Sequence, residues 1–156
     1  MPLSLPPLLP FEGDWQTYED KVYAAYLECI IKGDLRFNNL PVRPRYTPET
    51  KGKHFGFWHM VSEGDVEEDR TPDLERCARI RWVSWVIEHC TVHPEISWWA
   101  ETRNNKKAIV IWVEVEQYVV VLSERRDYWL LKTSYLATKS GKIRQLQKNR
   151  EKYAKP

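Results

Sequence analysis

Apolar residues in the first part of the chain recur at helical spacing. From Asp14 to about Lys32 they fall every three or four positions, with Asp14 suited to cap the first turn and Gly33 suited to end the helix. The stretch 34–53 holds three prolines, so we predict mostly loop there, with a short extended piece near 42–46.

A strand and a second helix are predicted next. Residues 54–61 (HFGFWHMV) alternate between two faces, as a half-buried strand does. An acidic loop follows. Thr71 and Pro72 then form a typical helix start, with a hydroxyl to cap the first turn and a proline at the first helical position. We expect this helix to continue to about His89.

Beyond Pro94 the hydrophobic period changes to two, which is typical of strands. Short polar turns join the segments, so we expect an antiparallel meander. Four strands are predicted: 95–101, 107–116, 118–124 and 128–137. The last stretch, 138–156, holds seven Lys or Arg residues against one Glu, and we expect a basic helix over 140–155.

This order of elements predicts an α+β fold. N-terminal helices should pack on one face of an antiparallel sheet of four to five strands, followed by the basic C-terminal helix. No repeat or Gly- or Ser-rich linker divides the chain, so residues 1–156 are predicted to form one domain. Residues 1–13 hold four prolines and lack the basic start of a signal peptide. We expect them to form an extended arm on a cytoplasmic protein that has no membrane partner.

Composition excludes several classes of protein. The chain has 156 residues, of which 42% are hydrophobic and 29% charged, so it is neither disordered nor fibrous. Residues 1–70 carry 8 basic and 12 acidic side chains, a net charge of −4, whereas residues 71–156 carry 16 and 10, a net charge of +6. The second half is therefore compatible with a face that binds polyanions, or with an ordinary solvated surface of uneven charge.

Neither a metal site nor a cofactor site is predicted. The three cysteines cannot all pair with one another, and reduced, buried thiols suit a cytoplasmic protein. His89, Cys90 and His93 lie close together, but no second pair follows at zinc-finger spacing. The six glycines form neither a dinucleotide-binding nor a Walker pattern.

The segment 59–81 offers residue types suited to RNA cleavage without a metal. That reaction needs a base, an acid and cations that stabilise the charge developing on the phosphate. His59, the acidic residues after it, and Arg70, Arg76 and Arg79 supply these types. The helix start near them would add backbone donors for an anion. The alternative is structural, with His59 in the core and the arginines paired with neighbouring carboxylates.

Polar residues interrupt the last predicted strand. Lys132, Thr133, Ser134 and Tyr135 follow one another in a segment otherwise rich in Leu and Trp. Their hydroxyls could satisfy buried backbone groups, or they could lie at an open site that holds a phosphate. The residue types favour neither interpretation.

The C-terminal helix is a candidate nucleic-acid-binding element. Lys142, Arg144 and Lys148 surround its thin apolar stripe and could follow a phosphate backbone. The helix could instead dock on an acidic, antitoxin-like protein, or remain solvated.

Two runs of residues resemble a known group of proteins. These runs are F-W-H-x-x-S-E-G … E-D-R-T-P-D-L-x-R-C-x-R-I-R-W and I-W-V-E-x-x-x-Y-V-V-V-L-x-x-R-x-x-Y-x-L-L-K-T-S-Y. Over residues 55–136 the chain is similar to small bacterial and phage-associated proteins that are grouped with the barnase–EndoU–colicin D–RelE type of ribonuclease fold. Members have one or two helices followed by a four-stranded antiparallel sheet, and their last strand often has Ala where this chain has Ser134.

The resemblance implies cleavage of tRNA or messenger RNA without a metal, often by a toxin. The implied catalytic positions in this sequence are His59, Arg70, Arg76, Arg79, Thr133 and Tyr135, with Glu63 and Glu68 as candidate bases.

Three functional hypotheses follow. The first is a metal-independent ribonuclease or nuclease-like toxin, with RNA as substrate. The second is a non-catalytic nucleic-acid-binding module, in which Lys132, Lys142, Arg144 and Lys148 hold RNA. The third is a protein-interaction module that forms a homodimer or binds another protein. Its anchors would come from a set of tryptophans, namely Trp58, Trp98, Trp99 and Trp112.

Overall fold

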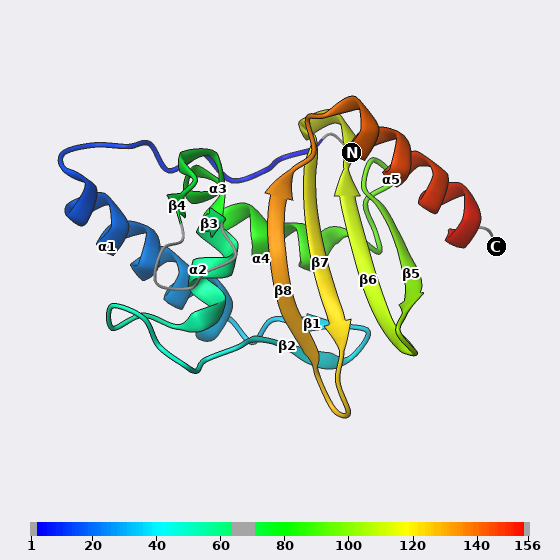
Figure 1. Cartoon of the computed structure of the whole chain (residues 1–156), viewed down its shortest axis with the longest axis horizontal. Helices are drawn as coiled ribbons and strands as arrows, with labels where there is room; N and C mark the ends of the chain where they lie inside the picture. The colour runs from blue at the N-terminus through cyan, green and yellow to red at the C-terminus, as the bar shows by residue number, and fades with distance from the viewer. Residues whose placement is uncertain (1–2, 64–70, 155–156) are drawn as a thin grey trace.

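The computed structural model describes residues 3–63 and 71–154 of the chain. Six strands form one sheet in the order β1-β2-β8-β7-β6-β5 (Figure 1). Their bounds are β1 Arg36–Phe37, β2 Leu40–Pro44, β5 Ser97–Arg103, β6 Lys106–Val113, β7 Tyr118–Glu124 and β8 Trp129–Leu136. A separate two-stranded pair joins β3 Ser62–Glu63 to β4 Thr71–Pro72. The helices are α1 Trp15–Tyr26, α2 Phe55–Val61, α3 Leu74–Ala78, α4 Ile80–His89 and α5 Ser140–Tyr153.

The predicted α+β class is confirmed, but the sheet is larger than expected and mixed. Strands β5 to β8 form the predicted antiparallel meander. The proline-rich stretch adds β1 and β2, and β2 runs parallel to β8, with Val42 opposite Trp129 and Pro44 opposite Leu131. The short extended piece predicted near 42–46 overlaps β2, but its place in the sheet was not predicted, since two of its residues are prolines that cannot donate to a ladder.

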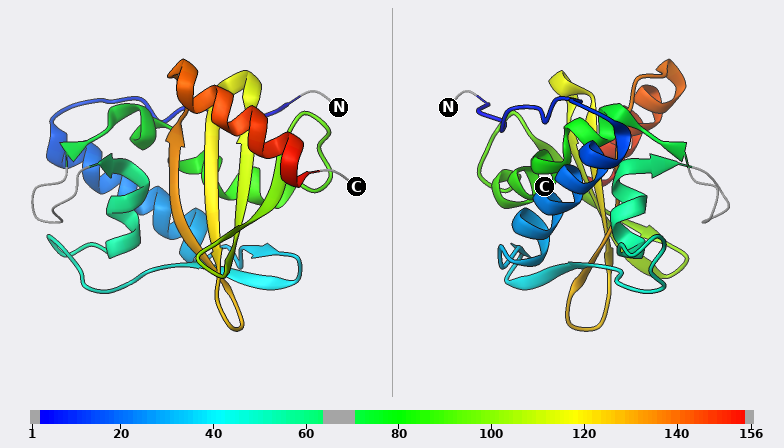
Figure 2. Two further views of the ribbon diagram at one scale, coloured as in Figure 1. Left: turned by 45° about the vertical axis from the view of Figure 1, so that its right-hand side comes forward. Right: turned by 90° about the vertical axis from the view of Figure 1, so that its left-hand side faces the viewer.

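Helices cover both faces of the sheet, whereas the sequence predicted helices on one face. One side of β6 (Ile109, Ile111) packs into the cluster that contains α1 and α4. The other side (Val110, Trp112) packs against α5 through Leu146. Figure 2 shows α5 lying across the face opposite α4. Burial on both faces explains why β6 has a continuous apolar run rather than an alternating one.

The segment predicted as a strand over 54–61 is the helix α2. Its buried residues Phe57, Met60 and Val61 have the spacing of one helical face, and Trp58 is buried beside them. In a segment of eight mostly apolar residues, a helical pattern and an alternating pattern can both be fitted. The pattern therefore could not decide between them, and the prediction of a strand was wrong. The helix lies beside the edge of β8 (Figure 1).

The helix predicted from Thr71 to His89 is two helices. Thr71 and Pro72 belong to β4, and the true cap is Asp73, whose carboxylate accepts from the backbone N–H groups of Glu75 and Arg76. At Arg79 the backbone leaves helical geometry (φ −102°, ψ 15°), which separates α3 from α4.

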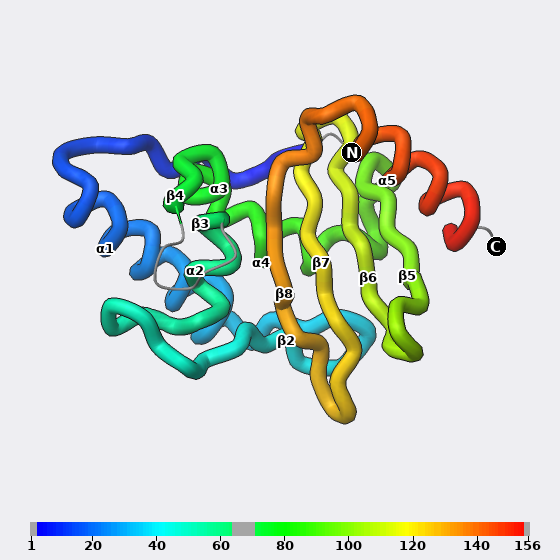
Figure 3. The backbone as a smooth tube through the Cα atoms, viewed as in Figure 1, coloured from blue at the N-terminus to red at the C-terminus, as the bar shows by residue number. Residues whose placement is uncertain are grey.

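The first helix begins where the sequence predicted, and a π-helical segment, Leu27–Ile31, continues α1 to near the predicted end. The Asp14 carboxylate accepts from Thr17 N–H at 2.8 Å, and this backbone hydrogen bond lowers the pKa of Asp14. Residues 3–13 contain neither helix nor strand, and the tube in Figure 3 follows them to the start of α1. The Pro6 carbonyl accepts from Trp82 Nε1 at 2.7 Å, which fixes the arm against α4. Within the described ranges, no helix is both long enough and apolar enough to cross a membrane.

Candidate nucleic-acid interface

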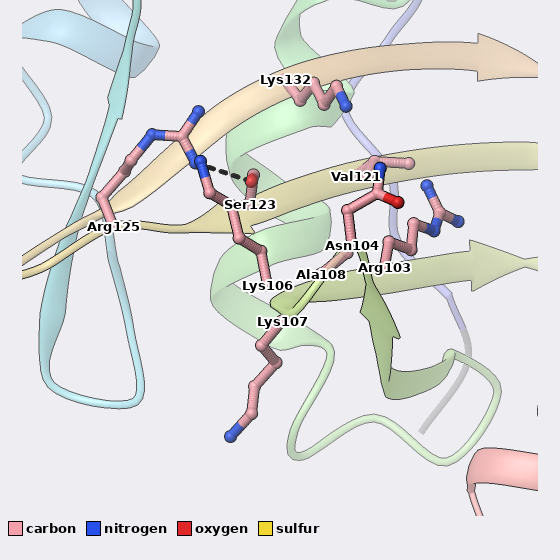
Figure 4. A pocket seen from close by; sticks show the side chains of 9 residues that line it. All are labelled: Arg103, Asn104, Lys106, Lys107, Ala108, Val121, Ser123, Arg125 and Lys132. Atoms are coloured by element: carbon pink, nitrogen blue, oxygen red, sulfur yellow. Dashed lines mark hydrogen bonds between the residues drawn. The ribbon is translucent and has the colours of Figure 1, made fainter.

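Helix α5 leaves one end of its sheet face uncovered, and this end is basic. Leu146 of α5 belongs to an apolar cluster with Trp99, Trp112 and Val119, and Val121 of the same cluster lies at the border of the uncovered end. Away from these contacts lies an open cavity of about 290 Å³ (Figure 4). Its cationic lining residues come from β5 to β8 and the turns between them: Arg103, Lys106, Lys107, Arg125 and Lys132. In the close-up, the Lys107 side chain points away from the other four.

Strand register extends this basic surface to β2. Ser123 of β7 pairs with Leu130 of β8, and Leu130 is also the register partner of Arg43. Paired residues share a face, so the exposed Arg43 lies on the face of Ser123. Arg45 and Lys132 each follow the last residue pair that joins β2 to β8, Pro44 and Leu131, so both lie at the end of that pairing. We call the following set the basic stripe: Arg43, Arg45, Arg103, Lys106, Arg125 and Lys132.

A bulge in β8 helps to present Lys132. Thr133 pairs with Val121 and Leu131 pairs with Leu122, so Lys132 is the extra residue on β8. Leu131 is buried in the core, whereas Lys132 is exposed and lines the cavity. A bulge commonly redirects a side chain in this way.

Little negative charge balances the basic stripe. The Glu101 carboxylate is buried, and it accepts from Trp99 Nε1 at 2.7 Å and from Arg103 at 3.1 Å. The Arg125 guanidinium donates to Ser123 Oγ at 2.8 Å. Among residues 3–63 and 71–154, no carboxylate forms an ion pair with the other five cations of the basic stripe.

The polar residues of the last strand mostly satisfy backbone groups. Thr133 Oγ1 donates to the His59 carbonyl at 3.1 Å, and Ser134 Oγ donates to the Met60 carbonyl at 3.5 Å. Lys132 differs from them, because it is exposed. Of the two interpretations left open by the sequence, backbone satisfaction therefore applies to Thr133 and Ser134.

The predicted catalytic arginines make contacts inside the molecule. Arg76 donates to the Ser62 carbonyl at 2.9 Å and forms ion pairs with Asp73 at 3.4 Å and Glu63 at 3.9 Å. Arg79 pairs with Glu75 at 3.0 Å, and its side chain is only 13% exposed. The structure thus brings Glu63 to Arg76, and Thr133 to His59. Two further predicted positions, Glu68 and Arg70, lie outside the described residues.

The predicted cations of α5 lie apart from the cavity. The Lys142 ammonium is 5.5 Å from the centre of the Tyr135 ring. Arg144 and Lys148 are exposed and line a shallow groove on α5 that also includes Glu151.

Three of the four tryptophans predicted as anchors for a protein partner are buried. Trp58, Trp99 and Trp112 are buried and cannot serve as exposed anchors, whereas Trp98 is half-buried. In the part of the chain that the structure describes, no group of three His, Cys, Asp or Glu side chains is arranged to hold a metal ion.

No family model, curated protein or solved structure matches this chain. The function of the site is therefore inferred from its own residues. Sequence reasoning identified Lys132 but missed the other five cations of the basic stripe. Part of the signal was available, because Lys106 and Arg125 flank predicted strands whose turns would meet at one end of a meander. Arg43 and Arg45 gave no such signal, since their position depends on the parallel pairing of β2.

Proposed function

We propose that the protein binds RNA through the basic stripe. The observation that carries this proposal is the collection of six cations on one uncovered sheet end, where only one of them is paired with a carboxylate of the described residues. A surface of this kind favours a polyanion, because cations that neutralise phosphates release condensed counterions.

The extent of the basic stripe supports a chain-like ligand rather than a small anion. Its residues come from β2, β8, β7, β6 and β5 or the turns at their ends. Neighbouring strands lie about 4.8 Å apart, so five strands span about 19 Å. A phosphate backbone laid across the strands would meet several of these cations in turn. The hydroxyl of Ser123 and the amide of Asn104 add neutral hydrogen-bonding groups to the same cavity.

The test compares two double variants that change the net charge equally. Lys106→Gln/Lys132→Gln removes two cations of the basic stripe, and Lys21→Gln/Lys32→Gln removes two exposed lysines, one in α1 and one in the turn before β1. Fluorescence anisotropy with a labelled single-stranded RNA, at salt concentrations between about 50 and 200 mM, gives the salt slope of each protein. The first variant should bind more weakly, with a slope smaller by about 1.4, since each lost phosphate contact removes about 0.7.

Two results would contradict the proposal. If the two double variants weaken binding equally, net charge rather than the basic stripe governs affinity. If the unaltered protein does not bind RNA at low salt, the function itself is wrong, and a protein partner becomes the stronger hypothesis.

A second candidate function is RNA cleavage without a metal, in the manner of a nuclease-like toxin. The observation that favours it is the hydrogen bond between Thr133 and the His59 carbonyl, which joins two predicted catalytic positions next to Lys132. In this proposal His59 transfers a proton and the basic stripe holds the substrate. Glu63 and Arg76 would then contribute from the neighbouring β3 and α3, with Arg79 and Tyr135 as further contacts.

A further inference from the structure

Three side chains form a stack at the end of β2. The Arg45 guanidinium lies over the Phe55 ring, 4.3 Å from its centre. The Phe55 ring in turn stacks on the His59 ring, with centres 4.4 Å apart and planes inclined by 23°. Phe55 and His59 are half-buried, whereas Arg45 is exposed. The stack therefore presents a guanidinium plane to solvent, with aromatic rings beneath it.

Backbone contacts hold this stack in place. Gly56 N–H donates to the Arg45 carbonyl at 2.7 Å. A Cβ atom at Gly56 would lie 2.8 Å from Pro44 Cβ and 3.0 Å from the backbone nitrogen of Arg45, so only glycine allows this approach. Because α2 begins against the end of β2, Phe55 is brought under the arginine.

The Arg45 head group is oriented from a second direction. Its Nε donates to the Thr47 carbonyl at 2.7 Å, which fixes the plane of the guanidinium. Within the described ranges, the two terminal nitrogens of Arg45 have no hydrogen-bond partner. They remain available to a ligand that covers the plane or lies at its edge.

We infer that Arg45 stacks on a base of single-stranded RNA whose phosphates lie along the basic stripe. This inference rests on the proposed function and specifies the class of its ligand. Unpaired bases stack on aromatic rings and on arginine planes, and such contacts tolerate different sequences because every base has a π face. Arg45 and Lys132 both lie where the pairing of β2 with β8 ends, so a strand whose phosphates lie along the basic stripe can place one base on Arg45. Bases within a duplex are covered on both faces, so a duplex cannot use this contact.

Two ligands of equal charge separate stacking from phosphate binding. One is a labelled oligoadenylate of about twelve nucleotides, and the other is an abasic ribose-phosphate chain of the same length. The protein should bind the oligoadenylate at least about five-fold more tightly than the abasic chain, the lower end of what one stacked base contributes. Arg45→Lys keeps the charge but lacks the plane, so it should lose this preference, with a larger loss of affinity for the oligoadenylate than for the abasic chain.

Arg126→Lys is the matched control, because Arg126 is an exposed arginine outside the basic stripe and lies over no aromatic ring in the described part of the chain. It should retain the preference for bases. If the unaltered protein binds both ligands equally, or if Arg45→Lys weakens both ligands equally, the stacking inference is wrong although the basic stripe still binds phosphates. If neither ligand binds, the proposed function fails and the inference fails with it.

Discussion

The Thr133 hydroxyl donates a hydrogen bond of 3.1 Å to the main-chain carbonyl of His59, joining residues 74 positions apart in the chain. Ser134, the next residue on β8, does the same for the Met60 carbonyl. Two consecutive hydroxyls thus attach the last turn of α2 to the strand. Where β2 no longer pairs with β8, α2 takes its place beside that strand, and the side chains of His59 and Phe55 are carried next to the basic stripe.

Thr133→Val should destabilise the protein by about 1 kcal/mol, because valine has the same shape but leaves the His59 carbonyl without this donor. Urea denaturation measures the change in the free energy of unfolding. The control is Thr102→Val on β5, where the exposed threonine makes no side-chain hydrogen bond within the described residues. Equal effects of the two substitutions would show that the bond to His59 contributes nothing.

Gly56→Ala should lower the free energy of unfolding by roughly 1–3 kcal/mol, the usual cost of overpacking. The added methyl group meets Pro44 Cβ and the backbone of Arg45 at 3.0 Å or less, and these atoms cannot move as a flexible side chain would. Gly141→Ala in α5 is the matched control, since a Cβ atom there meets nothing within 4 Å. Alanine is the better helix former, so the control should be neutral or stabilising. A stable Gly56→Ala protein would contradict the close packing of α2 on β2.

The sequence predicted the larger elements of this fold because their signals are local. Asp14 caps its helix through its own side chain. The short turns of the meander are compatible only with antiparallel pairing of β5 to β8. The pairing of Arg43 with Leu130 depends on residues about ninety positions apart, and nothing local specifies it.

The same distinction applies to the candidate site. Lys132 was recognisable as a charged residue within an apolar strand. The stack beneath Arg45 could not be recognised in the sequence, because residues 54–61 were predicted as a strand. In a strand, Phe55 and His59 would be too far apart to stack. In α2 they are four residues apart on one helical face.

The free energy of unfolding should fall as the pH rises above about 9. Burial raises the pKa of the Cys77 and Cys90 thiols to about 12. In the unfolded chain these thiols ionise near pH 8.5, so between about pH 9 and 12 the unfolded state loses protons that the folded state keeps, which favours unfolding. Burial also raises the pKa of Tyr18 to about 12, which acts in the same direction. Urea denaturation at about pH 7.5 and pH 10, with reductant present, measures the difference, and equal stability at both values would contradict burial of these groups.

Arg144→Gln/Lys148→Gln should weaken RNA binding less than Lys106→Gln/Lys132→Gln does. The α5 pair is exposed, shares its groove with Glu151 and lies apart from the cavity. The Glu151 carboxylate in this groove repels a phosphate and so offsets part of the attraction of the two cations. The salt slopes of the two variants in the same anisotropy assay provide the comparison. A larger loss of RNA affinity for the α5 variant would contradict this prediction and assign the RNA-binding surface to the helix rather than to the sheet.

His59→Ala separates cleavage from binding. If His59 transfers a proton, its removal should lower RNA cleavage by about 10²–10⁴-fold while RNA affinity changes far less, since the basic stripe remains intact. The assay incubates purified protein with RNA in EDTA and compares fragment patterns. Thr133→Val is the second variant, because it removes the hydrogen bond that attaches the His59 backbone to β8 and keeps the imidazole. Circular dichroism of each variant ensures that a lost activity does not reflect an unfolded chain. Cleavage that survives in folded His59→Ala would exclude this residue as the acid or base, and intact RNA with the unaltered protein would leave binding as the function of the basic stripe.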